Sequence, residues 1–136
     1  QYIYPLEAVA YPATPAQSFK VNGVSEIMFV RQQQLLVVER SFSTGRLSCT
    51  VKIFLVDLSK AVNVKDRLAL EPQDLQFAAT KKLLFNLDDL GIYIDNVECV
   101  TWGPVLPNGH RTLIFVTDNN FLPTEQTQFF LFEVLP

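Results

Sequence analysis

The stretch LLVVERSF at residues 35–42 decides the fold, because a related stretch, IFVTDNNF, recurs at residues 114–121. Each stretch starts with an apolar run, continues with an acid and two polar residues, and ends on Phe. The match aligns Glu39 with Asp118. Recurrence of one pattern along a chain indicates a structural repeat, so we expect both stretches to form the same strand in two copies of one unit.

The segments around these stretches repeat as well. SEIMFV (25–30) matches VECVTW (97–102), and IFLVD (53–57) matches FFLFE (129–133). The first of these matches aligns Glu26 with Glu98, and the second aligns Asp57 with Glu133. The copies differ in length mainly at the loop GPVLPNGH, where an insertion costs little. We therefore expect a three-stranded meander that occurs twice.

Short runs rich in β-branched and aromatic residues recur along the chain, whereas helical periodicity is scarce. The expected strands are residues 24–30, 35–41, 51–57, 82–87, 96–102, 112–118 and 127–134. The strand at 82–87 serves as a fourth strand of the first copy. Residues 59–80 are polar and include Pro72, so we expect a long connection there.

The second and third strands of each unit are apolar on both faces, which indicates sheets that are covered on both sides. We therefore predict an all-β fold, a partial β-propeller with about two blades of antiparallel meander and an orphan N-terminal strand, QYIYPLEAV. A propeller needs about four to eight blades, so we expect residues 1–136 to be a single domain, the C-terminal fragment of a longer propeller. Its exposed sheet edges would favour self-association. A two-sheet β-sandwich is the alternative.

Composition argues against two classes of partner. Hydrophobic residues make up 49% of the chain and charged residues 18%, which suits a packed globule and not a disordered chain. No stretch concentrates basic residues beyond Lys81 and Lys82, which we expect to be solvated, so nucleic acid is not an expected partner. No apolar run exceeds four residues, so no membrane span is expected.

The cysteines and the histidine limit the chemistry further. Cys49 and Cys99 are too few for a disulfide framework, and we expect both to be free, buried thiols. His110 is the only histidine, which excludes a Cys/His metal site. There is no G-x-S-x-G motif either, so a Ser-His-Asp triad is not expected.

Acidic residues within the apolar strands have a functional and a structural interpretation, because buried carboxylates rarely lack a partner. In the first, Glu26, Glu39, Glu98 and Asp118 surround a central channel as catalytic acids and bases, with Glu98 and Asp118 as candidate ligands of a divalent cation such as Ca²⁺. In the second, Glu39 or Glu26 forms a structural ion pair with Arg40 that links the blades. The sequence leaves both interpretations open.

The run Asp118-Asn119-Asn120 has the same two interpretations. Asp and Asn end strands well, because their side chains bond nearby backbone groups and tolerate left-handed conformations. Their oxygens would also suit Ca²⁺ or Mg²⁺. After this run, we expect Phe121 to re-enter the core as Phe42 does in the first copy.

Several segments resemble, in order, the C-terminal part of the phytase-like domain, a bacterial family described as having esterase-like activity of phytase. The broader segments are YPLEA, SEIMFV, LLVVERSF, VKIFLVDL and TQFFLFEVL. The most specific are ER at 39–40, DN-x-E at 95–98 and RTL-x-x-V-x-DNNF ending at Phe121. The resemblance spans roughly residues 2–135 and departs from the family at Cys99, where the family has Gly.

This resemblance implies a parent protein with further blades upstream that hydrolyses a phosphate or carboxylate ester of a small molecule, in the periplasm or outside the cell. Among the motif positions, Arg40, Asn96, Asn119 and Asn120 are the candidate substrate-binding residues. We expect the chain alone to lack turnover, because a channel site needs the missing blades. The alternative is a non-catalytic propeller that serves as a binding or scaffold module.

Overall fold

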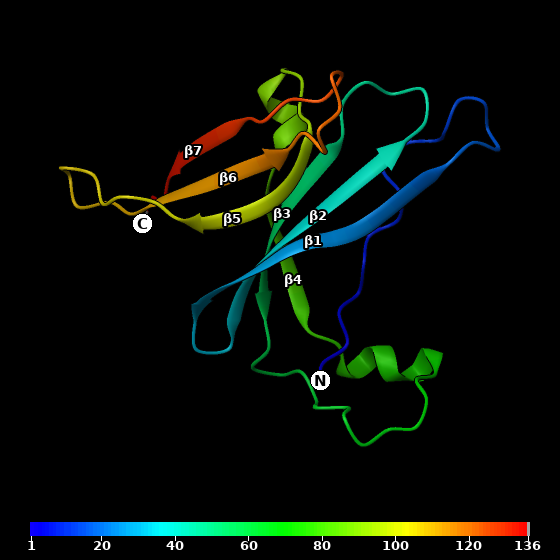
Figure 1. The fold of residues 1–136 in the computed structure, drawn as a ribbon. Helices are drawn as coiled ribbons and strands as arrows, with labels where there is room; N and C mark the ends of the chain where they lie inside the picture. Colours follow the sequence, from blue (N-terminus) through cyan, green and yellow to red (C-terminus); the bar gives the residue numbers. More distant parts are fainter. Residues whose placement is uncertain (136) are drawn as a thin grey trace.

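Two antiparallel sheets make up the fold in a computed structural model that describes residues 1–135 (Figure 1). The first sheet has the strand order β1-β2-β3-β4 and the second β5-β6-β7. The strands are β1 (Lys20–Arg31), β2 (Gln34–Ser43), β3 (Thr50–Asp57), β4 (Thr80–Asn86), β5 (Asn96–Trp102), β6 (Thr112–Asp118) and β7 (Phe129–Glu133). Two short 3-10 helices, η1 (Pro72–Phe77) and η2 (Leu87–Leu90), precede and follow β4. The all-β prediction is confirmed, and within residues 1–135 the sheets form no closed barrel or propeller.

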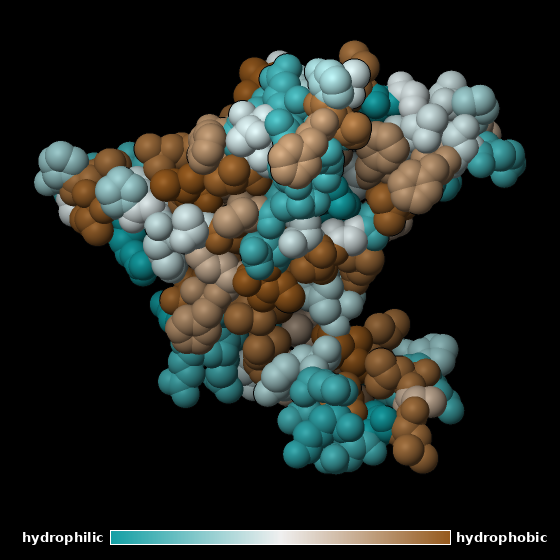
Figure 2. All heavy atoms as spheres, in the orientation of Figure 1, coloured by the Kyte–Doolittle hydropathy of each residue, from teal (hydrophilic) through white to brown (hydrophobic). Residues whose placement is uncertain are grey.

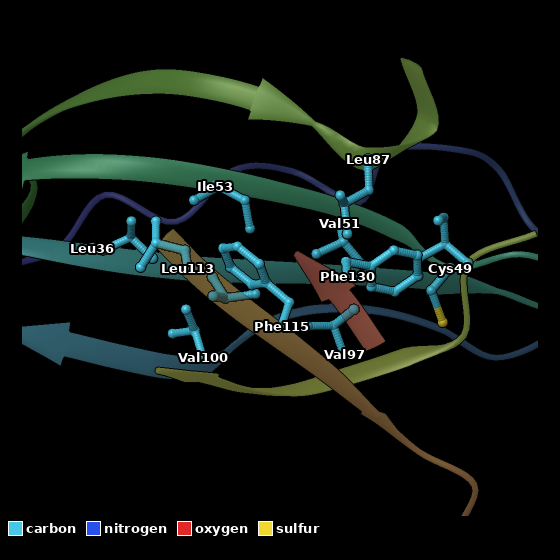
Figure 3. Close-up of a cluster of buried hydrophobic side chains, with 12 residues drawn as sticks. Leu36, Cys49, Val51, Ile53, Leu87, Val97, Val100, Leu113, Phe115 and Phe130 are labelled. Carbon is cyan, nitrogen blue, oxygen red and sulfur yellow. The ribbon is translucent and has the colours of Figure 1, made fainter. Parts of the chain in front are cut away.

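The core lies between the two sheets, because alternate side chains of β2 and β3 face those of β5, β6 and β7 (Figure 3). Its most buried members are Val38, Val51, Ile53, Leu87, Ile94, Val97 and Phe115. Phe115 meets the ring of Phe85 edge to face, with centroids 5.9 Å apart. The predicted apolar strands therefore pack sheet against sheet.

The predicted orphan N-terminal strand is wrong. No strand forms between residues 1 and 19, and the first residues instead cross the outer face of the first sheet. From Glu39 to the end of β2, every second side chain bonds this segment's backbone: Glu39 to Glu7, Ser41 to Ala10 and Ser43 to Tyr11. The segment lies over a face and not along an edge, since these side chains satisfy its backbone groups.

The structure contains the repeat, but the sequence alignment of its third strands, residues 53–57 with 129–133, is wrong by one residue. Val24 pairs with Glu39 in the first sheet, and Asn96 pairs with Asp118 in the second, so the two acids are equivalent. A β-bulge follows each pairing. In the third strands, Asp57 pairs with Gln34 and Glu133 with Thr112. Because Glu39 is equivalent to Asp118, Thr112 is equivalent to Gln33 and not to Gln34. Glu133 is therefore not equivalent to Asp57, and a shift of one residue turns a side chain to the opposite face of the sheet.

The outer face of the second sheet carries exposed apolar side chains. Phe129 is 72% exposed and Leu131 is 60% exposed, and Figure 2 shows hydrophobic atoms over the region where Figure 1 draws β6 and β7. The expectation that both sheets are covered on both faces thus holds only for β2 and β3 of the first sheet, because Phe29 on the outer face of β1 is 65% exposed. Phe121 is 98% exposed, so the prediction that it re-enters the core is also wrong. In residues 1–135 no helix is long and apolar enough to cross a membrane.

Candidate functional site

A cleft of about 610 Å³ opens at one end of the core, between the two sheets. It lies where β1, β3 and β5 begin and where β2 and β6 end, and the loop before β7 closes one side. The lining residues are Phe19, Val21, Arg40, Phe42, Arg46, Leu47, Cys49, Tyr93, Asp95, Asn96, Asn120, Thr124, Glu125 and Gln126. Three of the four predicted substrate-binding residues, Arg40, Asn96 and Asn120, therefore meet in one cleft.

Arg40 reaches the cleft from β2 and is bridged to the second sheet. Its Nη1 lies 3.7 Å from Oε1 of Glu98, and the same Oε1 accepts a hydrogen bond of 2.8 Å from Nδ2 of Asn96. Glu98 is partly exposed, so the ion pair adds little stability, about 1 kcal/mol or less. Arg40 thus pairs with Glu98 of the second sheet, and the predicted ion pair of Arg40 with Glu39 or Glu26 is wrong.

Arg46 is a second cation in the cleft, and the sequence interpretation missed it. It follows Gly45 in the loop between β2 and β3, and its guanidinium carbon lies 3.7 Å from the ring centroid of Tyr11. Its Nε is buried and has no hydrogen-bond partner among the described residues, and the same holds for Oδ1 of Asn96. Both atoms are buried, so neither is exposed to the cleft.

Asp95 organises the wall of the cleft that leads into β5. The side chain is 4% exposed and accepts hydrogen bonds from the Tyr93 hydroxyl at 3.0 Å and from the backbone N–H groups of Gln126 and Asn96 at 2.6 and 2.8 Å. Burial and the hydrogen bond to Asp95 raise the pKa of Tyr93 to about 12. The three residues of the DN-x-E motif thus have different roles: Asp95 fixes the loop, Asn96 lines the cleft and Glu98 bridges to Arg40.

The run Asp118-Asn119-Asn120 forms a turn. The oxygen Oδ1 of Asp118 accepts from the backbone N–H of Asn120, and Oδ1 of Asn119 accepts from that of Phe121, both at 3.1 Å. Asn120 and Phe121 adopt left-handed φ values of 46° and 56°. The interpretation in which these side chains bond nearby backbone is confirmed. Only Asn120 lines the cleft, where its Nδ2 donates to Glu125 at 2.7 Å.

Glu39 points away from the cleft into the outer face of the first sheet and is 1% exposed. Its carboxylate accepts from Lys81 Nζ and the Tyr4 hydroxyl at 2.6 Å each, from Asn22 Nδ2 at 2.8 Å and from the backbone N–H of Glu7 at 3.1 Å. Burial alone would raise the pKa of Glu39, but these donors, Lys81 foremost, outweigh burial and hold the pKa below its usual value. The prediction that Lys81 is solvated is wrong.

The four predicted acids are therefore not gathered around one point. Glu39 is bound on the outer face, Glu98 lies beside Arg40, Asp118 caps a turn, and Glu26 accepts from the adjacent N–H of Ile27. Among residues 1–135 no group of three or more His, Cys, Asp or Glu side chains is placed to hold a metal ion. The described residues thus do not fit the Ca²⁺ site that the sequence suggested.

Both cysteines are free, as predicted, but only one is buried. Cys49 lines the cleft, and burial raises the pKa of its thiol, which keeps it protonated and unreactive. Cys99 is exposed on the outer face of the second sheet, so the prediction of burial is wrong there.

The fold and the cleft define an all-β protein in which two antiparallel meanders pack face to face around an arginine-lined cleft. A model of the phytase-like family, described as "esterase-like activity of phytase", matches residues 1–121. The match covers most of the chain, so the chain belongs to the phytase-like family, as the resemblance predicted. Comparisons with curated proteins and with solved structures found no match.

Proposed function

We propose that this chain is the C-terminal part of an ester hydrolase acting on phosphate or carboxylic esters, and that the cleft between its sheets binds the anionic group of the substrate. The observation that carries the proposal is the presence of two arginines, Arg40 and Arg46, beside the Asn96 amide in one cleft. A planar guanidinium matches the paired oxygens of a phosphate or carboxylate, and it keeps its charge at any relevant pH.

The contacts of these arginines suit them to hold an anion in a fixed place. Glu98 orients Arg40, and the ring of Tyr11 holds Arg46 in position. Donors that are fixed before the reaction stabilise the charge that develops on the ester oxygens at little reorganisation cost. Glu125, which also lines the cleft, is a candidate general base for the attacking water. We assign no step to a metal ion.

The parent fold that we propose is a propeller, in which these sheets are two adjacent blades. The sheets contact each other mainly through β1 and β5, the first strand of each. The innermost strands of neighbouring blades meet in this way around a propeller axis. Exposed apolar side chains on both outer faces, such as Phe29 and Phe129, would then pack against the blades on either side.

The test uses the protein encoded by the complete reading frame, assayed on phenyl phosphate and phenyl acetate beside this chain alone. We expect Arg40→Gln and Arg46→Gln to lower kcat/KM at least about tenfold. Arg111→Gln is the matched control, because Arg111 stacks on Trp102 at 3.5 Å outside the cleft. Unchanged kcat/KM in both cleft variants would refute the proposed site, and equal turnover by this chain alone would refute its status as a fragment.

A non-catalytic binding module is the second candidate. It is favoured because the carboxylates near the cleft already have hydrogen-bond or ion-pair partners. Asp95 is bound by three donors, Glu98 by Arg40 and Asn96, and Glu125 by Asn120. Glu125→Gln separates the two candidates. Lost turnover with retained affinity for phenyl phosphate supports an enzyme, whereas no turnover in the wild-type protein, together with binding, supports a binding module.

A further inference from the structure

We infer that the cleft is built for an amphipathic ester, with one anionic group joined to an apolar group such as an aryl ring, and not for a polyphosphorylated ring. This inference rests on the proposed function, since it takes the arginine-lined cleft to be the substrate site. Two features carry it: the charges of the cleft cancel, and one of its walls is apolar.

The charge of the lining is balanced. Two arginines, Arg40 and Arg46, face two carboxylates, Asp95 and Glu125, and no lysine lines the cleft among the described residues. The carboxylate of Glu98, just outside the cleft, also balances the charge of Arg40. Recognition of a polyanion such as inositol hexakisphosphate needs a surplus of positive charge over many phosphate groups. The two guanidinium groups can contact one phosphate or carboxylate, and the cleft has no surplus positive charge for further phosphate groups.

The wall formed by the start of β1 and the end of β2 is apolar. Val21 and Phe42 are cross-strand partners on the face that lines the cleft, and the rings of Phe19 and Phe42 lie 6.2 Å apart. Leu47 extends this wall from the loop after β2. Phe19 and Leu47 are largely exposed, so they add little to the core. A ligand that covers them would remove apolar surface from water.

The two features are adjacent on one strand. Arg40 and Phe42 are two residues apart on β2, so their side chains project from the same face about 6.5 Å from each other. That separation is on the scale of an ester whose anionic group sits at one arginine while its ring rests on Phe42. A ligand of this shape would place its anionic group at a guanidinium that lines the cleft and cover the apolar wall together.

The test is calorimetric titration of the chain with phenyl phosphate, inorganic phosphate and inositol hexakisphosphate at one ionic strength. We expect phenyl phosphate to bind about tenfold more tightly than inorganic phosphate, and the hexakisphosphate to bind no more tightly than inorganic phosphate. Phe19→Ser and, separately, Leu47→Ser should remove most of the tenfold preference. Both positions are exposed, so these variants should fold, and matching circular dichroism spectra check this.

The arginines separate failure of this inference from failure of the proposed function. If the hexakisphosphate binds most tightly and Arg46→Gln weakens it, the anion site stands and the amphipathic inference falls. The inference also falls if phenyl phosphate and inorganic phosphate bind equally, or if both Phe19→Ser and Leu47→Ser keep the preference. If no ligand binds, or Arg46→Gln changes nothing, the proposed site itself is wrong, and the inference falls with it.

Discussion

Glu39 and Asp118 occupy equivalent positions in the two repeats, yet their surroundings are opposite. Glu39 is buried with four donors, whereas the side chain of Asp118 is exposed and accepts from the turn that follows it. The difference comes from the N-terminal segment, which crosses the outer face of the first sheet and brings Tyr4 and the backbone of Glu7 to Glu39. No described segment covers the second sheet in this way.

The apolar residues of the two sheets show the same contrast. On the first sheet, Val37, Phe54 and Val56 form a second small core with Tyr4, under the N-terminal segment and the connection that follows β3. On the second sheet, Phe129 and Leu131 on the outer face are exposed. The presence of the N-terminal segment over a sheet, and not the sequence of the strand, therefore decides whether a repeated position is buried.

The largest effect should come from breaking the buried acid. Glu39→Ala leaves Lys81 with only the Glu7 carboxylate at 3.0 Å, and we expect a loss of about 3 kcal/mol in the free energy of unfolding. Asp118→Ala should cost less than about 1 kcal/mol, because its partner is exposed. Urea denaturation measures both. The double variant Glu39→Leu/Lys81→Met should recover part of the loss, and equal losses in the two single variants would contradict the comparison.

A smaller effect should come from the contact between Gly45, in the loop after β2, and Thr14 of the N-terminal segment. Gly45 has a φ of +92°, and an added Cβ would lie 2.8 Å from the backbone oxygen of Thr14. Gly45→Ala should therefore cost about 1–3 kcal/mol. Gly23→Ala is the control, because an added Cβ there meets nothing within 4 Å. A Gly45→Ala protein as stable as the Gly23→Ala protein in urea would show that the segment is held loosely.

The smallest effect should be that of pH, since protonation removes the charge of Glu39 but keeps its carboxyl in place. Its donors hold the folded-state pKa below the ordinary value of 4.5, so its contribution is complete above pH 4.5 and is lost as pH falls through the lowered pKa. Urea midpoints between pH 7 and pH 3 should show a shallower acid-side decline for Glu39→Gln than for wild type. Identical declines would exclude the ion pair as a source of acid sensitivity, and Asp118→Asn serves as the matched control.

The strands could be predicted because their signal is local. Alternation and β-branched runs placed all seven described strands within a few residues, and the repeat identified the equivalence of Glu39 and Asp118. The DN-x-E motif also identified part of the cleft, since Asn96 lines it. The turn at Asp118 was within reach for the same reason, because Asx turns depend on neighbours two residues away.

Contacts between distant segments could not be predicted in this way. Lys81 is 42 residues from Glu39, and a basic residue beside a turn carries no mark of such a partner. Arg46 looked like an ordinary loop residue, because its stacking on Tyr11 depends on where the N-terminal segment runs. The slip of the third strand was hidden too, since β7 is apolar at nearly every position and its pattern does not fix a register.

The sequence by itself determined the all-β class, the repeated meander, the family and the position of an acid at the end of each second strand. Only the tertiary structure decided which acid is buried, which arginine joins the sheets and where the cleft opens. The physical reason is that strand formation depends on side chains a few residues apart, whereas burial and charge pairing depend on what covers each face. In this chain that cover comes from residues far away in sequence.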